Sequence, residues 1–217
     1  MTLSRSRFPW EQEALDFVFE RFPAQDNYRT WANFEFIADD GSINEVDLLV
    51  ACPQGIFLIE IKSRPGTVRG DGLTWTWEHE GRMKTVDNPV LLANRKCKRL
   101  KSLLVRQRAF KNEAHPYIEP IVFLSHPDVK SLLSGVAANN VRLRDILPRG
   151  NSSGRMGIMS AIQRRDCPGL KQFLFSPVNR PMIRALAHSL EQAGIRPSQA
   201  ARRVGDFVLD RLVFDSP

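Results

Sequence analysis

The chain has 217 residues, of which 42% are hydrophobic and 25% are charged, as is typical of a globular domain. No stretch approaches the roughly 20 consecutive apolar residues of a membrane-spanning helix, and the opening MTLSRSRFPW lacks the apolar core of a signal peptide. We therefore expect a soluble, cytoplasmic protein without a membrane partner. The formal charge of +7 is uneven, because residues 1–90 carry 9 Lys/Arg and 15 Asp/Glu whereas residues 91–217 carry 22 and 9. The acidic part could hold metal ligands and the basic part could contact a polyanion, although a solvated basic surface explains the charge equally well.

The first expected element is an amphipathic helix over residues 9–22. A proline stands in its first turn, and Pro23 comes just past its end. Its apolar side chains recur at helical spacing: Trp10, Ala14, Phe17 and Val18. The same face brings up carboxylates of this helix.

Three strands are expected next, as an antiparallel meander. Residues 28–37 are rich in aromatic and β-branched side chains, and Asp39-Asp40-Gly41 then supplies a turn. Residues 45–51 predict the second strand. A short turn at Pro53-Gln54-Gly55 leads directly into the third strand, residues 56–62.

The glycine-rich segment of residues 64–83 contains TWTWE and predicts a further hairpin. We expect this hairpin to extend the edge of the same sheet. Trp75 and Trp77 should share one face of it, because they are two residues apart in a strand.

A long amphipathic helix is predicted to begin at Asn88-Pro89 and to end near Phe110. Its expected apolar face comprises Leu92, Ala93, Cys97, Leu100, Leu103 and Leu104. Its expected basic face comprises Arg95, Lys96, Lys98, Arg99 and Lys101. Arg95, Lys96, Lys98 and Arg99 could bind the phosphates of a nucleic acid, although a solvated helix face is the simpler interpretation.

An apolar strand over residues 118–125 should return the chain to the sheet, with its direction left open. Residues 129–133 predict a short helix, residues 149–157 a loop and residues 179–193 the last helix. The fold class is therefore α/β, with a mixed sheet flanked by helices and a C-terminal helical extension. The expected division is a main domain over residues 1–135, an extension that packs on it over residues 136–193, and a linker region over residues 194–217.

The three cysteines, Cys52, Cys97 and Cys167, lie far apart and show no metal-ligand spacing. We expect each to be buried, and we expect neither a zinc site nor a disulfide framework.

Two carboxylates and a lysine are expected to meet on the second and third strands. Glu60 and Lys62 are two residues apart in one strand and point to the same face, and the tight turn brings Asp47 beside them, to within a residue of register. Buried acidic groups side by side cost several kcal/mol unless a cation neutralises them, and Mg²⁺ prefers such oxygen ligands. A neighbouring lysine suits orienting or deprotonating an attacking water in phosphodiester hydrolysis. Alternatively, the three residues form an ion-paired cluster on a solvated sheet face.

The order G-x-x-x-EVD, a short spacer and then PxGIFLIEIKS, which ends at Ser63, resembles the nuclease-related domain called NERD, a branch of the PD-(D/E)xK superfamily, over about residues 9–125. The resemblance implies a restriction-endonuclease-like core that hydrolyses DNA with Mg²⁺ or Mn²⁺. It also implies that Asp47, Glu60 and Lys62 are the catalytic residues.

The resemblance further implies that a carboxylate of the first helix joins Asp47 and Glu60 as a metal ligand. Glu13 is our choice and Glu11 the alternative, because both flank the apolar face of that helix. The family often carries a glutamine in the helix that begins at Asn-Pro, whereas this sequence has Leu92 there.

Residues 204–217, VGDFVLDRLVFDSP, resemble the opening strand of a protein-kinase-like domain. Some NERD-like domains are joined to a Ser/Thr-kinase-like domain in phage-defence systems of the BREX and Pgl kind. We therefore expect an endonuclease of such a system, with a chain that continues beyond Pro217 into a kinase-like domain and with a homo-oligomer or a defence complex as partner. The alternatives are a non-catalytic nucleic-acid-binding or kinase-regulating module, a nuclease that acts on RNA or nucleotides, and a C-terminal segment that packs on the domain itself.

Overall fold

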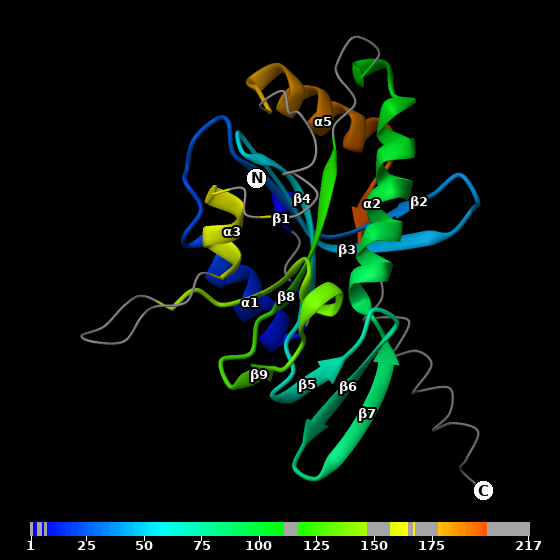
Figure 1. Ribbon diagram of the computed structural model, residues 1–217. Coiled ribbons are helices and arrows are strands. Elements are labelled where there is room, and N and C mark those ends of the chain that lie inside the picture. The colour runs from blue at the N-terminus through cyan, green and yellow to red at the C-terminus, as the bar shows by residue number, and fades with distance from the viewer. Residues whose placement is uncertain are drawn as a thin grey trace, which may run out of the picture.

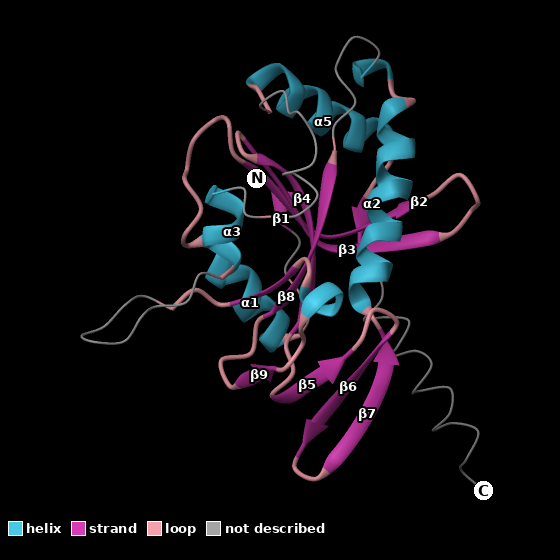
Figure 2. Cartoon of the chain, viewed as in Figure 1, coloured by secondary structure: helices cyan, strands magenta, loops and turns pink. Residues whose placement is uncertain are grey.

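The structure is a computed structural model, which describes residues 2–3, 6, 8–110, 117–146, 157–164, 167 and 178–198 (Figure 1). A mixed sheet stands at its centre with helices on both faces, and a smaller sheet projects from one end (Figure 2). This is the predicted α/β architecture with a restriction-endonuclease-like core.

Within the described residues the central sheet has seven strands in the order β1-β2-β3-β4-β8-β10, with β11 also pairing with β2. The bounds are Thr2–Leu3 (β1), Arg29–Ile37 (β2), Ile43–Cys52 (β3), Gly55–Lys62 (β4), Ile118–Leu124 (β8), Val141–Leu143 (β10) and Arg196–Pro197 (β11). The predicted antiparallel meander of β2, β3 and β4 is confirmed. The direction left open for β8 is parallel to β4, as is usual when a helix connects two strands of one sheet.

Alternating side chains of β3 and β4 face two separate apolar layers. Over Leu48 to Cys52, even-numbered residues of β3, such as Leu48, pack with α1 (Pro9–Phe19) and α3 (Ile158–Arg164). Odd-numbered residues, such as Leu49, pack with α2 (Pro89–Val105) and α5 (Arg180–Gln192). Period-two alternation thus assigns the side chains of β4, and those of β3 after Asp47, to one layer each. Before Asp47 the parity changes, because Val46 packs in the layer of α2 and α5.

The first helix is present, but it ends at Phe19 and its apolar face differs from the prediction. Ala14, Leu15 and Val18 are buried, whereas Trp10 is 57% exposed. Trp10 stands in the first turn and stacks on Phe8, with ring centroids 5.2 Å apart. The local aromatic partner takes the place of the sheet contact that helical spacing predicted.

The predicted hairpin forms, but its expected place at the edge of the central sheet is wrong. Its strands are β5 (Gly66–Gly70), β6 (Thr74–His79) and β7 (Arg82–Asp87), and they form a separate sheet in the order β7-β6-β5-β9. Strands β3 and β8 already occupy both edges of β4, so no edge is left for the hairpin. Trp75 and Trp77 are both buried in one cluster, as the spacing predicted.

The short helix predicted over residues 129–133 is wrong. Val129–Ser131 is strand β9, which pairs in parallel with β5 at Gly66 opposite Val129. A run of five residues does not distinguish a strand from a helix, and the pairing partner lies about sixty residues earlier in the chain.

Helix α2 begins as predicted, because the side chain of Asn88 accepts the Val90 N–H at 2.9 Å and a proline occupies the first helical position. A short 3₁₀ helix, η1 (Arg108–Phe110), comes after it. The predicted burial of two side chains on this helix is wrong. Leu92 is 41% exposed, and Lys96, expected in solvent, is only 7% exposed.

Lys96 stands three residues after the buried Ala93 and four before the buried Leu100, and this spacing places it on the buried stripe of α2. Leu92 lies beside that stripe, and the sheet does not reach it. The observed apolar face of α2 is therefore rotated slightly about the helix axis from the predicted one.

The last helix is confirmed as α5, capped by Asn179, whose side chain accepts the Met182 N–H at 2.9 Å. Immediately after it, Arg196–Pro197 of the expected linker pairs with β2. The predicted loop, apart from Gly157, and the kinase-like residues 204–217 lie outside the described residues. The division into domains stays a prediction.

All three cysteines are buried, and no disulfide joins them. None of the helices in the described part of the chain combines the length and the apolar character needed to cross a bilayer.

Candidate active site

The candidate site lies where β4 separates from β3. Pairing between the two strands extends to Leu48 opposite Ile59 and then stops, while β3 continues beside β2. At this fork the side chain of Asp47 replaces a backbone partner, because its Oδ2 accepts the Ile61 N–H at 2.7 Å. Asn33, which faces Asp47 from β2, has a left-handed φ of 50°, and the regular pairing skips it. Strand β4 therefore leaves the ladder at Asp47, and the pairing with β2 is interrupted there for one residue. The carboxylate of Asp47 is fixed in the fork.

Glu60 is buried beside this fork and is held by two lysines. Its side chain shares the face of β4 with Lys62, whose Nζ lies 2.8 Å from Oε1. The other oxygen, Oε2, lies 2.6 Å from the Nζ of Lys96, which reaches it from α2. Each oxygen of Glu60, which is only 4% exposed, thus has a lysine of its own.

The charges of these lysines determine the protonation of the cluster. Burial by itself would raise the pKa of Glu60, but Lys62 and Lys96 outweigh it and hold that pKa below its usual range. Burial by itself would lower the pKa of Lys62, but Glu60 and Asp47 outweigh it and raise that pKa. Glu60 is therefore ionised and Lys62 protonated at neutral pH. A protonated Lys62 suits orienting water and countering phosphate charge rather than removing a proton.

Asp47 is the carboxyl group whose charge the lysines compensate least. Burial raises its pKa to about 7, and the negative charge of Glu60 contributes in the same direction. Lys96 and Lys62 act in the opposite sense but do not restore the usual value. Its Oδ1 accepts no hydrogen bond from the residues that the structure describes. One carboxylate oxygen in the fork therefore remains open to a cation.

The first helix presents Glu11, and not Glu13, to this cluster. The charge of Glu11 raises the pKa of Asp47, and its Oε2 accepts a hydrogen bond from Ser6 Oγ at 2.6 Å. Glu13 turns away and forms an ion pair with Arg144, with 56% of its side chain exposed. Sequence spacing could not separate the two residues, because the rotation of α1 about its axis depends on packing.

The basic residues predicted on α2 do not form one surface. Lys96 belongs to the cluster, and Arg99 binds Asp40 at 2.7 Å and Asn44 at 3.0 Å in the β2–β3 hairpin. Arg95 and Lys98 are exposed. Of the four residues predicted to bind phosphates, Arg95 and Lys98 are therefore the two that are exposed and form no ion pair among the described residues.

The donor chemistry of the fork fits a hard divalent cation. Asp47 and Glu60 offer carboxylate oxygens, and Mg²⁺ is commonly bound through one or two carboxylates while it keeps several waters. Within the described residues, no three His, Cys, Asp or Glu side chains gather closely enough to form a complete protein cage. Lys62 and Lys96 would have to release Glu60 before its oxygens could turn to a metal.

Comparison with known proteins gives a family match and a similar protein. The family of nuclease-related domains, NERD, matches residues 6–125, which include β3, β4 and α2. The whole chain is similar to "Probable kinase PglW" of Streptomyces coelicolor, with 31% identity over 221 residues. The chain spans 13% of the length of that protein. No solved structure matches the chain significantly.

Proposed function

Because this chain belongs to the nuclease-related domain family, we propose that it is a divalent-metal-dependent nuclease domain that hydrolyses phosphodiester bonds in DNA. The observation that carries the proposal is the grouping of Asp47, Glu60 and Lys62 at the fork between β3 and β4. Two acidic groups and a cation, grouped at a half-buried fork with one open carboxylate oxygen, suit the chemistry of phosphate ester hydrolysis.

Asp47 and Glu60 would hold Mg²⁺ or Mn²⁺, which when bound would lower the pKa of water and polarise the phosphate. Glu11 takes the place of Glu13 as the carboxylate of α1 nearest this shell, because it is the one that acts on Asp47. The ammonium group of Lys62 would orient the attacking water and counter the charge that develops on the phosphate.

Lys96 has a separate role as a positioning residue. Its ion pair with Oε2 keeps the buried Glu60 neutralised when no metal is present. Because two cations cannot share one carboxylate oxygen without repulsion, metal binding would displace the Lys96 ammonium group. Lys96 would then be available to a phosphate oxygen near the same carboxylate.

DNA would reach the fork along α2, where Arg95 and Lys98 are exposed and could contact the phosphate backbone. Such contacts do not select the sugar, so RNA remains an alternative substrate. Comparing the salt dependence of binding to the two nucleic acids, and cleavage of each, distinguishes them.

A non-catalytic role is the second candidate, and one specific observation favours it. Lys62 and Lys96 already neutralise both oxygens of Glu60, so the cluster is stable without a metal. A domain that only binds nucleic acid, or that only regulates an attached kinase, would need such a metal-free cluster. A kinase domain farther along the chain and a place in a phage-defence complex are suggested by the similarity to the probable kinase. We also propose that this chain can form a homo-oligomer in such a complex.

A cleavage assay with Mn²⁺ separates the two candidates. Purified protein is incubated with plasmid, linear and single-stranded DNA, alongside Lys62→Ala and a matched control, Lys84→Ala, at an exposed position of β7. Wild type and Lys84→Ala are expected to cleave, and Lys62→Ala is expected to be slower by about 10²-fold or more. If neither wild type nor Lys62→Ala cleaves any of the three substrates, the nuclease proposal is wrong.

Metal binding is measured independently by calorimetry with Mn²⁺. Saturable binding is expected in wild type and is expected to disappear in Asp47→Ala. Binding without cleavage would support a metal-dependent binding module instead.

A further inference from the structure

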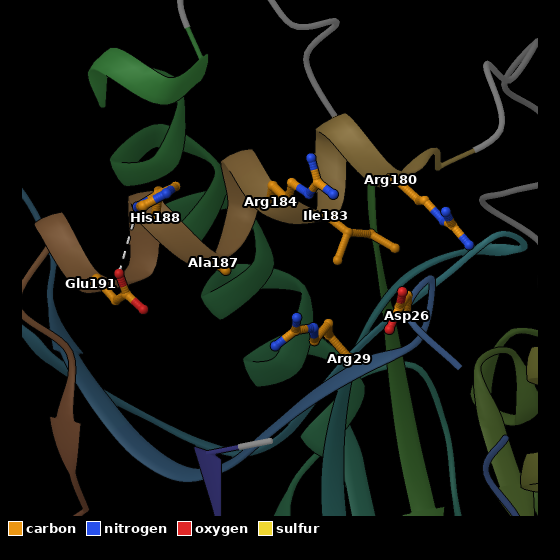
Figure 3. A pocket seen from close by; sticks show the side chains of 8 residues that line it. All are labelled: Asp26, Arg29, Arg180, Ile183, Arg184, Ala187, His188 and Glu191. Carbon is orange, nitrogen blue, oxygen red and sulfur yellow. Dashed lines mark ion pairs between the residues drawn. The ribbon is translucent and has the colours of Figure 1, made fainter. Parts of the chain in front are cut away.

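A hollow of about 350 Å³ lies between α5 and the start of β2 (Figure 3). We call it the α5 pocket. Side chains from one face of α5 form one wall, and Asp26 with Arg29 forms the opposite wall. Its lining comprises Asp26, Arg29, Arg180, Ile183, Arg184, Ala187, His188 and Glu191. The volume lies within the range of pockets that hold small molecules.

The α5 pocket is distinct from the candidate active site. Arg29 pairs across the sheet with Ala51, which in turn pairs with Ile56, four residues before Glu60 in β4. At about 3.3 Å per residue, the two regions are about 13 Å apart along the strands. Asp47, Glu60 and the two lysines therefore take no part in the pocket.

Three arginines give the α5 pocket its chemistry. Arg180 and Arg184 are one helical turn apart on α5, and Arg29 stands across from them on β2. In the part of the chain that the structure describes, none of the three forms an ion pair. A guanidinium group presents several N–H donors in a plane and matches the oxygens of a phosphate. Three such groups that form no ion pair among the described residues are suited to receive an anion.

The remaining polar groups restrict which anion fits. Asp26 and Glu191 also line the hollow, and Glu191 lies 3.6 Å from His188 at its far end. Carboxylates repel a bare polyanion, but they accept hydrogen bonds from hydroxyl and amino groups. Asp26 lies between Arg29 and Arg180, whereas Glu191 lies at the opposite end of the hollow (Figure 3). A ligand that carries a phosphate together with hydroxyl or amino donors suits both kinds of group, and Ile183 adds an apolar contact.

We propose that the α5 pocket binds a nucleotide, with its phosphate on Arg29, Arg180 and Arg184 and its sugar or base donors toward Asp26 and Glu191. The phosphate could belong to a free nucleotide or to the 5′ end of a nucleic-acid strand, because both present the same group. The proposal goes beyond the nuclease function and does not depend on it.

Calorimetry on the whole chain in EDTA tests the proposal, because EDTA removes metal-mediated binding at the fork. The ligands are AMP, ATP, inorganic phosphate, and a tetranucleotide with either a 5′-phosphate or a 5′-hydroxyl group. The variants are Arg184→Glu in the pocket and Arg82→Glu on β7, which change the net charge equally. Saturable binding of AMP or ATP is expected in wild type and Arg82→Glu, with affinity at least tenfold weaker in Arg184→Glu.

The outcomes are distinguishable. Binding of AMP or ATP that depends on Arg184 supports a free nucleotide, and binding only of the 5′-phosphorylated strand supports a strand end. Inorganic phosphate that binds as tightly as AMP would mean an adventitious anion only and would overturn the proposal. Equal weakening in Arg184→Glu and Arg82→Glu, or no saturable binding at all, would also overturn it. Retained binding in Asp47→Asn, which should fold as wild type does, would show that the result is independent of the candidate active site.

Discussion

The cluster at the fork and the α5 pocket both collect positive charge, but they use it in opposite ways. Lys62 and Lys96 are each committed to one oxygen of a buried carboxylate, whereas the arginines of the α5 pocket are exposed and form no ion pair among the described residues. A buried, paired cation supports the local structure and is released only by a competing charge. An exposed, unpaired cation costs little to maintain and is available to a ligand at once. The position of a basic residue, rather than its type, therefore determines whether a substitution affects stability or binding.

The largest expected effect comes from breaking the buried pair. Glu60→Gln leaves Lys96 charged, buried and without its carboxylate, which should lower the free energy of unfolding by about 3 kcal/mol. Urea unfolding of the metal-free protein measures this change. The exposed Arg184→Gln should change the same quantity by less than about 0.5 kcal/mol.

A double variant checks the cause. Glu60→Gln combined with Lys96→Met removes both buried charges and should recover most of the lost stability, because the methionine side chain packs where the lysine stem lay. If the single variant unfolds at the same urea concentration as wild type, Lys96 is not held by the charge of Glu60.

An effect of similar size is expected at Asp47, and it depends on pH. Because its folded-state pKa is about 7, against a usual value of 3.8, the folded chain retains a proton that the unfolded chain has already lost. Stability should therefore fall as pH rises from about 4 to about 7 and should not fall further on this account above pH 7. Asn at this position carries no charge and can still accept the Ile61 N–H.

Asp47→Asn should thus melt at the same temperature as wild type near pH 4 and about 10 °C higher at pH 8, in EDTA. The exposed Asp16→Asn is the matched control and should show no such divergence. A lower melting temperature of Asp47→Asn at pH 8 would contradict the assignment of Asp47 as the poorly compensated carboxylate.

The smallest expected effect separates the two carboxylates of α1. Glu11→Gln should weaken Mn²⁺ binding by about tenfold, because Glu11 lies within the field of Asp47. Glu13→Gln should change it by less than about twofold, because Glu13 is committed to Arg144. Calorimetry on both variants provides the comparison, and the reverse order of effects would restore Glu13 as the ligand.

The parts of the site that the sequence could predict are those joined by short-range geometry. Glu60 and Lys62 are two residues apart in a strand, and Asp47 lies across one tight turn, so alternation and register are sufficient to group them. Lys96 lies 36 residues away in the chain from Glu60 and was predicted on the basic face of its helix. Only its spacing from Ala93 and Leu100 could have shown that it is buried.

The fold shows the same pattern. The meander and both long helices could be predicted from local periodicity and capping. The place of the β5–β7 hairpin could not, because the strand that blocks the edge of β4 is β8, which comes more than thirty residues after the hairpin. Strand β9 was missed for a related reason, since its partner is distant in the sequence.

The outer edge of β2 has a consequence for how this molecule behaves at high concentration. Thr2–Leu3 covers the edge at Trp31 and Ala32, and Arg196–Pro197 covers it at Phe34 and Glu35. An uncovered edge of this apolar strand would offer unpaired N–H and C=O groups to the same strand of another molecule, which is a common route to aggregation. Two short segments from distant parts of the chain therefore block self-association through the edge of β2.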